Sequence, residues 1–390
     1  MISVSGLDVK KIIAPVIKRI VFSTALVCCL SACGIGPKDG SRVLHVDIDS
    51  ALEEQVSVFD ICSKIEIIPL STDAMISNGM YSAPQSLVVC EDNLFILDDK
   101  SQNIVCFSTL GEYVKTFNKR GRGHGEYTMA YGMTEDPGEV LSILDPTGRI
   151  FRYSINDSLT FLDVKRIKGL KAIHIMSDLV DGHRALYSYS EDNLLSILDD
   201  KGKAQPVTYH IDKRIKNRHF SRNPFFLYNS SLFVFDSIDG SSYEVDCTSH
   251  TVFPRYKWDL GKYKTKVHHI ARQKKEDFYE YLKTQSYNRV YPFLSIMSYG
   301  DKIYAEVILH NTEYMIVYDL ETNKSSFFCE TLEHVHFKPG VLRGNEMYLL
   351  VEPQYLSRFV NEKVLDKENM KRLSTVSDSS NVVLIKYSML

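Results

Sequence analysis

Asp92-Asn-Leu-Phe-Ile-Leu-Asp98 shows the unit from which this chain is built: a turn, a short apolar run and an acidic residue. The unit returns as Glu139-Val-Leu-Ser-Ile-Leu-Asp145 and as Asn193-Leu-Leu-Ser-Ile-Leu-Asp199. Less faithful copies are found at Ser231–Asp236, Asp301–Glu306 and Asn345–Leu350. Short apolar runs bounded by turn residues are typical of buried strands. Each copy therefore predicts a strand that ends near an acidic turn.

A second strand is expected to return after several of these runs. The returning segments are Asn103 to Phe107, Arg149 to Tyr153, Ser242 to Val245 and Tyr314 to Tyr318. A third strand follows a turn, as in Gly111 to Phe117, so the unit is a meander of three or four antiparallel strands. The units recur about every 45 residues, which is the spacing of propeller blades. Six of them fit between Ile65 and Leu390, and the predicted fold is an all-β, six-bladed propeller.

The two ends of this repeat array offer a way to close the ring. Ile65 to Leu70 is a strand-like segment before the first full meander, and Val382 to Tyr387 is the last strand of the chain. A propeller protects its edges when a strand from one terminus completes the sheet of the other. We therefore expect these two segments to pair, with Pro69 at the end of its strand because proline cannot donate to a ladder.

Two stretches depart from the strand pattern. Lys264 to Lys283 and Leu356 to Leu373 place apolar residues at helical spacing among charges, and both predict short helical insertions in blades. Elsewhere the composition suits pleated sheets, with 23 Tyr and 19 Phe in 390 residues. The net charge of −3 argues against a nucleic-acid partner, which requires a basic face.

The first residues read as an export signal. Lys10, Lys11, Lys18 and Arg19 are basic, and Ile20 to Leu30 is an apolar run shorter than the ~20 residues that span a bilayer. Leu30-Ser31-Ala32-Cys33 resembles the lipobox of bacterial lipoproteins, which implies cleavage before Cys33 and a lipid on its sulfur. We assign residues 1–32 to a lipoprotein signal peptide, 33–60 to the lipid anchor and a tether, and 61–390 to the propeller. A plain signal peptide or an N-terminal anchor helix are the alternatives.

Five cysteines remain outside the signal and the lipid site: Cys62, Cys90, Cys106, Cys247 and Cys329. An odd number argues against a disulfide framework. Cys90 and Cys106 fall in neighbouring predicted strands and could pair in an oxidising periplasm. The alternative is that all are buried free thiols.

The chain from about Cys62 onward resembles the six-bladed β-propeller lipoproteins of Bacteroides-type bacteria, relatives of NHL and TolB-like propellers. The resemblance rests on Phe107 to Phe117 followed by Arg120-Gly-Arg-Gly-His-Gly-Glu-Tyr127, with His124 where the family tends to have proline. Near the end, Asn381-Val382 stands where the family tends to have Asn-Pro. The resemblance implies an outer-membrane protein, periplasmic or surface-facing, and no particular chemistry.

Arg120 to Tyr127 is the most distinctive segment and the candidate site. In one interpretation it is a junction between blades, with Glu126 and Tyr127 locking it and an arginine paired with an acidic group. In the other, Arg120 and Arg122, together with His124, Glu126 and Tyr127, contribute to a ligand site in which the arginines bind an anion at the channel mouth.

The remaining motifs point to no catalytic residue, metal or cofactor. The glycine-rich segment has neither dinucleotide nor Walker spacing, and no Gly-x-Ser-x-Gly elbow occurs. His334 and His336 have no third ligand placed by the sequence. Asp98-Asp99, Asp199-Asp200 and Asp236 to Gly240 read as turns.

The predicted function is a lipid-tethered binding or interaction module. It attaches to the membrane through its N-terminal lipid, and its partner is a glycan, a peptide or an envelope protein. The alternative is a metal-dependent lactonase, hydrolase or lyase with a site on the propeller axis. That alternative needs several His, Asp or Glu side chains to converge there.

Overall fold

A computed structural model of the chain describes residues 40–52, 54–77, 84–156, 158–170, 173–188, 194–199, 201–207, 222–266 and 287–390. The chain divides into two units, Met1–Arg42 and Val43–Leu390. Cys33 and the predicted signal lie outside the described residues. None of the helices in the described ranges is long and apolar enough to cross a membrane.

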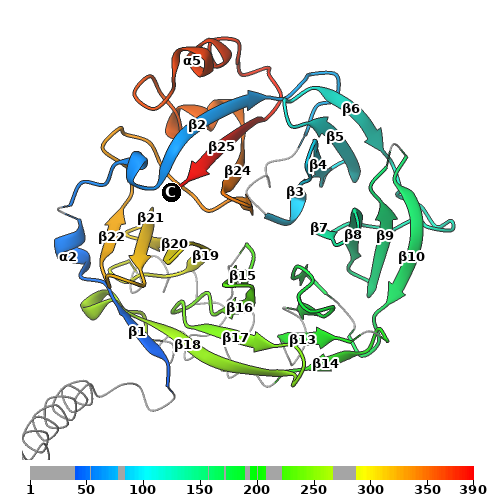
Figure 1. Ribbon diagram of the computed structural model, residues 1–390, viewed down its shortest axis with the longest axis horizontal. Coiled ribbons are helices and arrows are strands. Elements are labelled where there is room, and N and C mark those ends of the chain that lie inside the picture. The colour runs from blue at the N-terminus through cyan, green and yellow to red at the C-terminus, as the bar shows by residue number, and fades with distance from the viewer. Residues whose placement is uncertain are drawn as a thin grey trace, which may run out of the picture. The chain divides into compact units, whose positions relative to one another are not determined.

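The second unit is a six-bladed β-propeller, as predicted, with its sheets arranged around a central axis (Figure 1). From the axis outward, the first blade contains β3 (Leu87–Val89), β4 (Asn93–Asp98), β5 (Asn103–Ser108) and β6 (Tyr113–Phe117). The second contains β7 (Gly132–Asp136), β8 (Val140–Asp145), β9 (Arg149–Ser154) and β10 (Thr160–Arg166). The third contains β11 (Ile175–Met176), β12 (Arg184–Tyr187), β13 (Leu195–Leu198) and β14 (Ala204–Pro206). The fourth contains β15 (Phe225–Tyr228), β16 (Ser231–Phe235), β17 (Ser242–Asp246), β18 (Thr251–Asp259) and β1 (Arg42–His45). The fifth contains β19 (Phe293–Tyr299), β20 (Lys302–Leu309), β21 (Thr312–Asp319) and β22 (Ser325–Phe328). The sixth contains β23 (Val341–Arg343), β24 (Glu346–Val351), β25 (Val383–Met389) and β2 (Cys62–Pro69).

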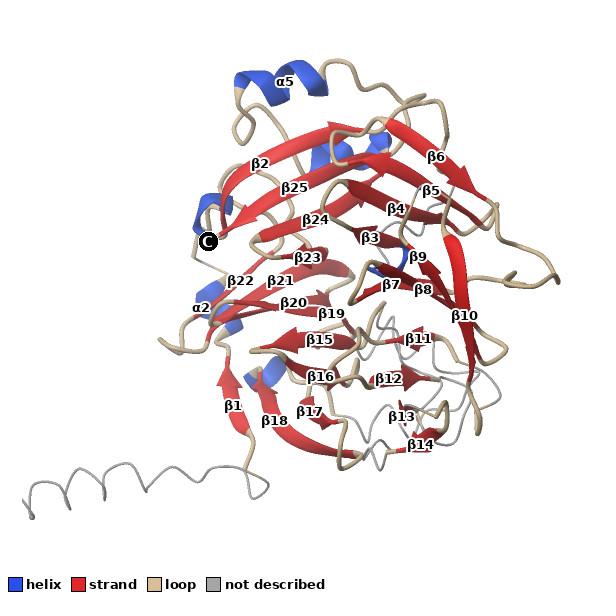
Figure 2. Cartoon of the chain, turned by 45° about the vertical axis from the view of Figure 1, so that its right-hand side comes forward, coloured by secondary structure: helices blue, strands red, loops and turns tan. Residues whose placement is uncertain are grey.

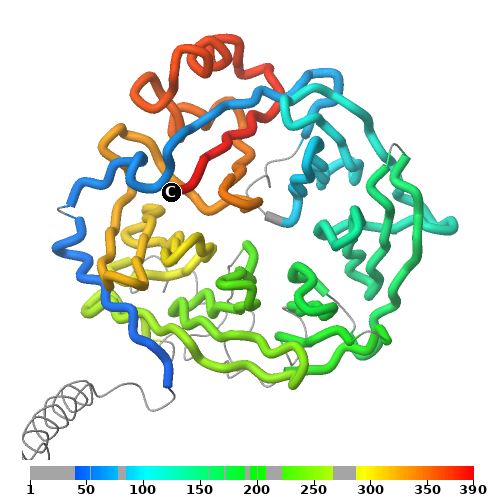
Figure 3. The backbone as a smooth tube through the Cα atoms, in the orientation of Figure 1, coloured from blue at the N-terminus to red at the C-terminus, as the bar shows by residue number. Residues whose placement is uncertain are grey.

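The ring closes as the sequence predicts. β2 pairs antiparallel with β25, with Ile67 opposite Ile385 and Pro69 opposite Val383 at the strand end. Figure 3 shows the blue strand β2 running beside the red strand β25. The sixth blade therefore contains strands from both ends of the propeller, and β25 lies between β24 and β2.

The predicted tether is wrong for the residues after Arg42. β1 adds a fifth strand to the fourth blade, and Leu44 within it is fully buried. The α2 helix (Ile48–Ala51) and the η1 helix (Val58–Asp60) follow, each with buried apolar residues. The folded unit therefore begins near residue 43 and not at residue 61. The sequence does not reveal this, because Leu44 and Ile48 alternate with polar neighbours over a stretch too short to be recognised as a strand or a helix.

Six hydrophobic clusters hold the blades together, one at each interface between neighbouring sheets. At the closing interface, Ile68 and Leu384 of the sixth blade pack with Leu94 and Phe107 of the first. Figure 2 shows the sheets stacked face to face in this way. Strands buried on both faces read as continuous apolar runs, which explains why the second strand of each blade is so apolar.

The acidic residues that end these strands are turn residues, as expected. Asp98 Oδ1 accepts a hydrogen bond from the Lys100 N–H at 3.2 Å, and Asp145 Oδ1 accepts one from Thr147 at 2.9 Å. Asp199 Oδ1 and Asp236 Oδ1 accept equivalent bonds from the residue two positions on, at 2.9 and 2.8 Å. An aspartate that bonds its own backbone in this way fixes a tight turn between two strands.

One helical insertion is partly confirmed and the other lies almost entirely outside the described residues. Within Leu356 to Leu373 the chain forms the end of η5 (Pro353–Arg358) and α5 (Lys367–Leu373). Asp366 caps α5, and Asn369 Oδ1 accepts a hydrogen bond from Ile67 N–H at 2.9 Å, so the helix is fastened to β2. Of Lys264 to Lys283, only the first three residues are described, directly after η4 (Gly261–Tyr263). The η2 helix (Pro84–Ser86) precedes β3.

Candidate functional site

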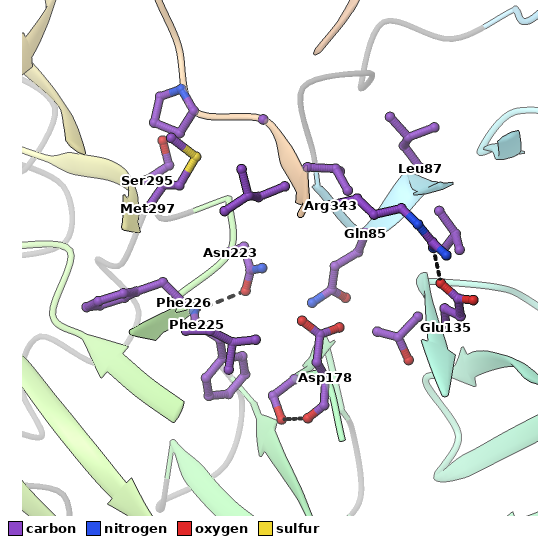
Figure 4. A pocket seen from close by; sticks show the side chains of 18 of the residues that line it. Gln85, Leu87, Glu135, Asp178, Asn223, Phe225, Phe226, Ser295, Met297 and Arg343 are labelled. Carbon is purple, nitrogen blue, oxygen red and sulfur yellow. Dashed lines mark hydrogen bonds and ion pairs between the residues drawn. The ribbon is translucent and has the colours of Figure 1, made fainter. Parts of the chain in front are cut away.

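A cavity of about 350 Å³ lies on the axis, where the innermost strands of all six blades meet (Figure 4). This volume is at the lower end of the range of small-molecule sites. Its walls are mixed, with apolar side chains from most blades and a few polar groups. The polar side chains in the lining are Gln85, Thr134, Glu135, Ser177, Asp178, Asn223, Ser295, Ser298 and Arg343.

Asp178 follows β11 and is the most unusual of these residues. Its carboxylate accepts no hydrogen bond and forms no ion pair with any described residue, whereas its own backbone carbonyl accepts a bond from Ser177 Oγ at 2.7 Å. The side chain is exposed to solvent and lines the cavity. Burial raises the pKa of the Asp178 carboxyl, an effect that Arg184 opposes and Asp136 reinforces.

Gln85 reaches into the cavity from η2. Its amide Nε2 donates to the Met176 carbonyl at 2.8 Å, so the first blade is tied to the third across the inner end of the second. Gly132 leaves the space for it, since a Cβ there would come within 2.4 Å of Gln85 Oε1. In Figure 4 the Gln85 amide and the Asp178 carboxylate point into the same part of the cavity.

Arg343 and Glu135 form an ion pair at the cavity wall. Arg343 comes from β23 and Glu135 from β7, and their N–O distance is 2.5 Å. The same Arg343 nitrogen also donates to the Val89 carbonyl of β3. This contact joins the sixth, first and second blades, and both side chains remain about one-third exposed.

A buried network behind Asp178 connects the second and third blades. Arg184 on β12 forms an ion pair with Asp136, and its other terminal nitrogen donates to Thr134 Oγ1 at 2.9 Å. Asp136 accepts a further bond from Ser142 Oγ at 2.6 Å. The Arg184 guanidinium thus has partners of its own, and none of the cations in the described ranges forms an ion pair with Asp178.

A second network extends from the opposite wall of the cavity. Ser295 Oγ donates to Glu306 Oε2 at 2.8 Å, and Glu306 is fully buried. Glu306 is balanced by Arg222 at 2.9 Å and Lys338 at 3.2 Å. Lys338 also contacts Glu313 at 2.7 Å. Partial burial acts to raise the pKa of the Glu313 carboxyl, but the Lys338 contact and the nearby arginines outweigh it and lower that pKa. These pairs join the fourth, fifth and sixth blades, and each charge in them has an opposite partner.

The predicted segment Arg120 to Tyr127 lies elsewhere, at the junction between β6 and β7. None of its residues lines the cavity. His124 packs edge-on against Phe161 of the outer strand β10, with ring centres 4.9 Å apart. Arg120 and Arg122 are exposed, and neither forms an ion pair within the described part of the chain. The expected pairing of an arginine with an acidic group is therefore absent there, and the arginines do not border the axial cavity.

Glu126 and Tyr127 do hold the junction, as the first interpretation proposed. Glu126 Oε2 accepts a hydrogen bond from Gly123 N–H at 2.7 Å. Tyr127 is fully buried and donates its hydroxyl to the Gln102 carbonyl at 3.0 Å, in the turn between β4 and β5. Gly125 has φ +71°, and a Cβ there would come within 2.6 Å of Phe161, so glycine is required.

Other sequence candidates do not form a site. Within the described ranges, no group of three or more His, Cys, Asp or Glu side chains could hold a metal. His334 and His336 lie in a turn region and not on a strand, each beside Glu330 at 3.8 and 3.6 Å. The five cysteines, including Cys90 and Cys106, are unpaired. Burial raises the pKa of Cys90 to about 12 and that of Cys106 to about 11.

Sequence reasoning missed every residue of the cavity. The innermost strands of the first, third and sixth blades have only two or three residues, such as Ile175–Met176, and the innermost strands have no repeated phrase. One signal was available: a polar residue interrupts an apolar stretch shortly before the second strand of a blade, as with Glu135, Asp178 and Ser295.

A family of domains of unknown function, DUF4934, matches residues 43–388. The fold is similar to that of the "Putative exported protein (BF0058)" of Bacteroides fragilis, with a TM-score of 0.65 and 14% identity over 90% of this chain and 100% of that one. A member of the DUF4221 family from Bacteroides vulgatus has a TM-score of 0.52 and 10% identity, over 86% of this chain and 98% of that one. At these identities the likeness concerns the fold alone. Among curated proteins none matches this chain.

Proposed function

We propose that this chain, which belongs to the DUF4934 family of domains of unknown function, is an exported β-propeller that binds a small ligand in its axial cavity. One observation carries the proposal: Asp178, a carboxylate without a partner among the described residues, lines an axial cavity of about 350 Å³. Ligand pockets contain a small number of placed polar or charged groups that orient the ligand, and an unpaired carboxylate on the cavity wall is such a group.

The wall of the cavity suits specific binding. Its polar groups come from different blades, and Gln85 and Arg343 are held in place by bonds to neighbouring blades. Side chains that are fixed before the ligand arrives lose little entropy on binding. The apolar side chains of Leu227 and Leu342, which are 41% and 36% exposed, supply surface that a ligand can bury.

Competition within the cavity tests this proposal. Fragment binding to the folded chain is measured by ligand-observed NMR, and hits are repeated on Leu227→Trp, which adds bulk to an exposed lining residue. Leu110→Trp is the matched control, because Leu110 is 75% exposed and outside the lining. The proposal requires fragments that Leu227→Trp displaces and Leu110→Trp retains. Hits that bind both variants equally, or no hits at all, would contradict it.

Export and anchoring belong to the same proposal. The basic and apolar N-terminal segment supports export, and so does the description of the similar Bacteroides fragilis protein as exported. We place the lipid on Cys33 and the propeller on the outer membrane. Labelled fatty acid should enter the wild-type protein and not Cys33→Ser, and incorporation into the variant would exclude this site.

A further inference from the structure

We propose that the ligand of the axial cavity carries a protonated amine and that the Asp178 carboxylate binds it. The inference rests on the proposed function, because it specifies the chemistry of the same cavity. It follows from the charges in the wall and from the partners that those charges already have.

The charge balance of the wall favours a cation. Among the described residues, three in the lining carry a charge: Glu135, Asp178 and Arg343. Glu135 and Arg343 neutralise one another, so the described part of the wall carries one net negative charge, on Asp178. A cationic group beside this carboxylate would neutralise that charge, whereas an anionic ligand would be repelled by it.

The nearby cations of the protein are occupied by other partners. Arg184, behind Asp178, forms an ion pair with Asp136 and donates to Thr134. Arg343 is held by Glu135 and by the Val89 carbonyl. Both cations thus already hold contacts between blades, and none of the described residues forms an ion pair with Asp178. A cationic ligand would supply the opposite charge.

A neutral ligand with hydroxyl groups fits less well. Such a ligand could donate hydrogen bonds to Asp178 but would leave the negative charge of the carboxylate unbalanced. That charge is already unfavourable, because burial raises the pKa of the Asp178 carboxyl, an increase that Arg184 opposes and Asp136 reinforces. An ammonium group supplies both the hydrogen-bond donors and the charge.

Two matched pairs of probes test the inference: benzylamine against benzyl alcohol, and glucosamine against glucose. Within each pair an amine replaces a hydroxyl. Binding to the folded chain is measured by calorimetry or ligand-observed NMR at neutral pH. Each amine should bind at least ~10-fold more tightly than its alcohol, as expected for one charge-assisted hydrogen bond in a desolvated site.

Asp178→Asn should remove this preference, and Asp181→Asn is the matched control, since Asp181 is exposed and outside the lining. Thermal unfolding shows that both variants are folded. Equal binding of amine and alcohol, or an amine preference that survives Asp178→Asn, would overturn the inference. If no probe binds while other fragments still depend on Leu227, the amine inference fails and the binding cavity stands.

Discussion

At the scale of single residues, Asp178 and Tyr127 have opposite effects on stability. Tyr127 buries its ring and satisfies its hydroxyl, so it contributes to folding. The protein around Asp178 raises the pKa of its carboxyl, and no described residue gives that carboxylate a hydrogen bond or an ion pair, so its charge works against folding. Natural proteins retain unfavourable residues of this kind mainly at functional sites.

Asp178→Asn should stabilise the empty protein, and the gain should depend on pH. Burial raises the pKa of Asp178 in the folded protein; the Arg184 charge opposes this increase and the Asp136 charge adds to it. At pH values between the unfolded and the folded pKa, the folded protein therefore holds a proton on Asp178 that the unfolded chain has released. Wild-type stability therefore falls as the pH rises through this window. Melting curves at about pH 4 and pH 7 should show a larger advantage for Asp178→Asn at pH 7. A pH-independent difference would disprove this.

Tyr127→Ala should destabilise the propeller by about 2–4 kcal/mol, because it empties a fully buried site at a blade interface. Tyr127→Phe should cost about 1 kcal/mol, the contribution of one buried hydrogen bond. Arg122→Ala is the control and should change stability by less than about 0.5 kcal/mol, since Arg122 is exposed. Denaturant titration measures all three. A large cost for Arg122→Ala would mean that this arginine has a structural role after all.

At the scale of elements, the second and third strands of the blades were predictable, whereas the innermost strands were not. A strand such as β8, buried on both faces and ended by Asp145, leaves an unmistakable apolar run. An inner strand such as β11 is two residues long and lines an open cavity, so it lacks both length and pattern. The site escaped prediction for the same reason: its residues lie on the elements with the weakest local signal, and only the closed ring brings them together.

β1 provides a direct test of where the folded unit begins. Leu44 is fully buried between the fourth and fifth blades, so Leu44→Ala should lower the free energy of unfolding by about 2–5 kcal/mol. Leu52, eight residues on, is 46% exposed, and Leu52→Ala should be nearly neutral. If the segment were a tether, both substitutions would leave the melting temperature unchanged.

At the scale of the whole molecule, the cavity exists only while the ring is closed. The contacts of Gln85 with Met176 and of Arg343 with Glu135 each span more than one blade, so the wall of the site and the ring depend on one another. The ring in turn depends on β25, which pairs with β24 on one side and with β2 on the other. Loss of this one strand would leave two unpaired edges in the sixth blade.

Ending the chain before Val383 should therefore abolish the folded propeller. The truncation removes the central pairing of the closing sheet and exposes the apolar surface of Ile65 and Ile67 on β2, together with an open strand edge prone to self-association. Omitting only Leu390, which is 55% exposed, is the control and should leave folding intact. Size-exclusion chromatography should find the first variant aggregated and the second in the wild-type form. A synthetic strand of residues 382–390, added during refolding, should restore part of the soluble protein, because its edges can pair with β24 and β2. A soluble, cooperatively melting chain without β25 would show that the ring does not need this strand for closure.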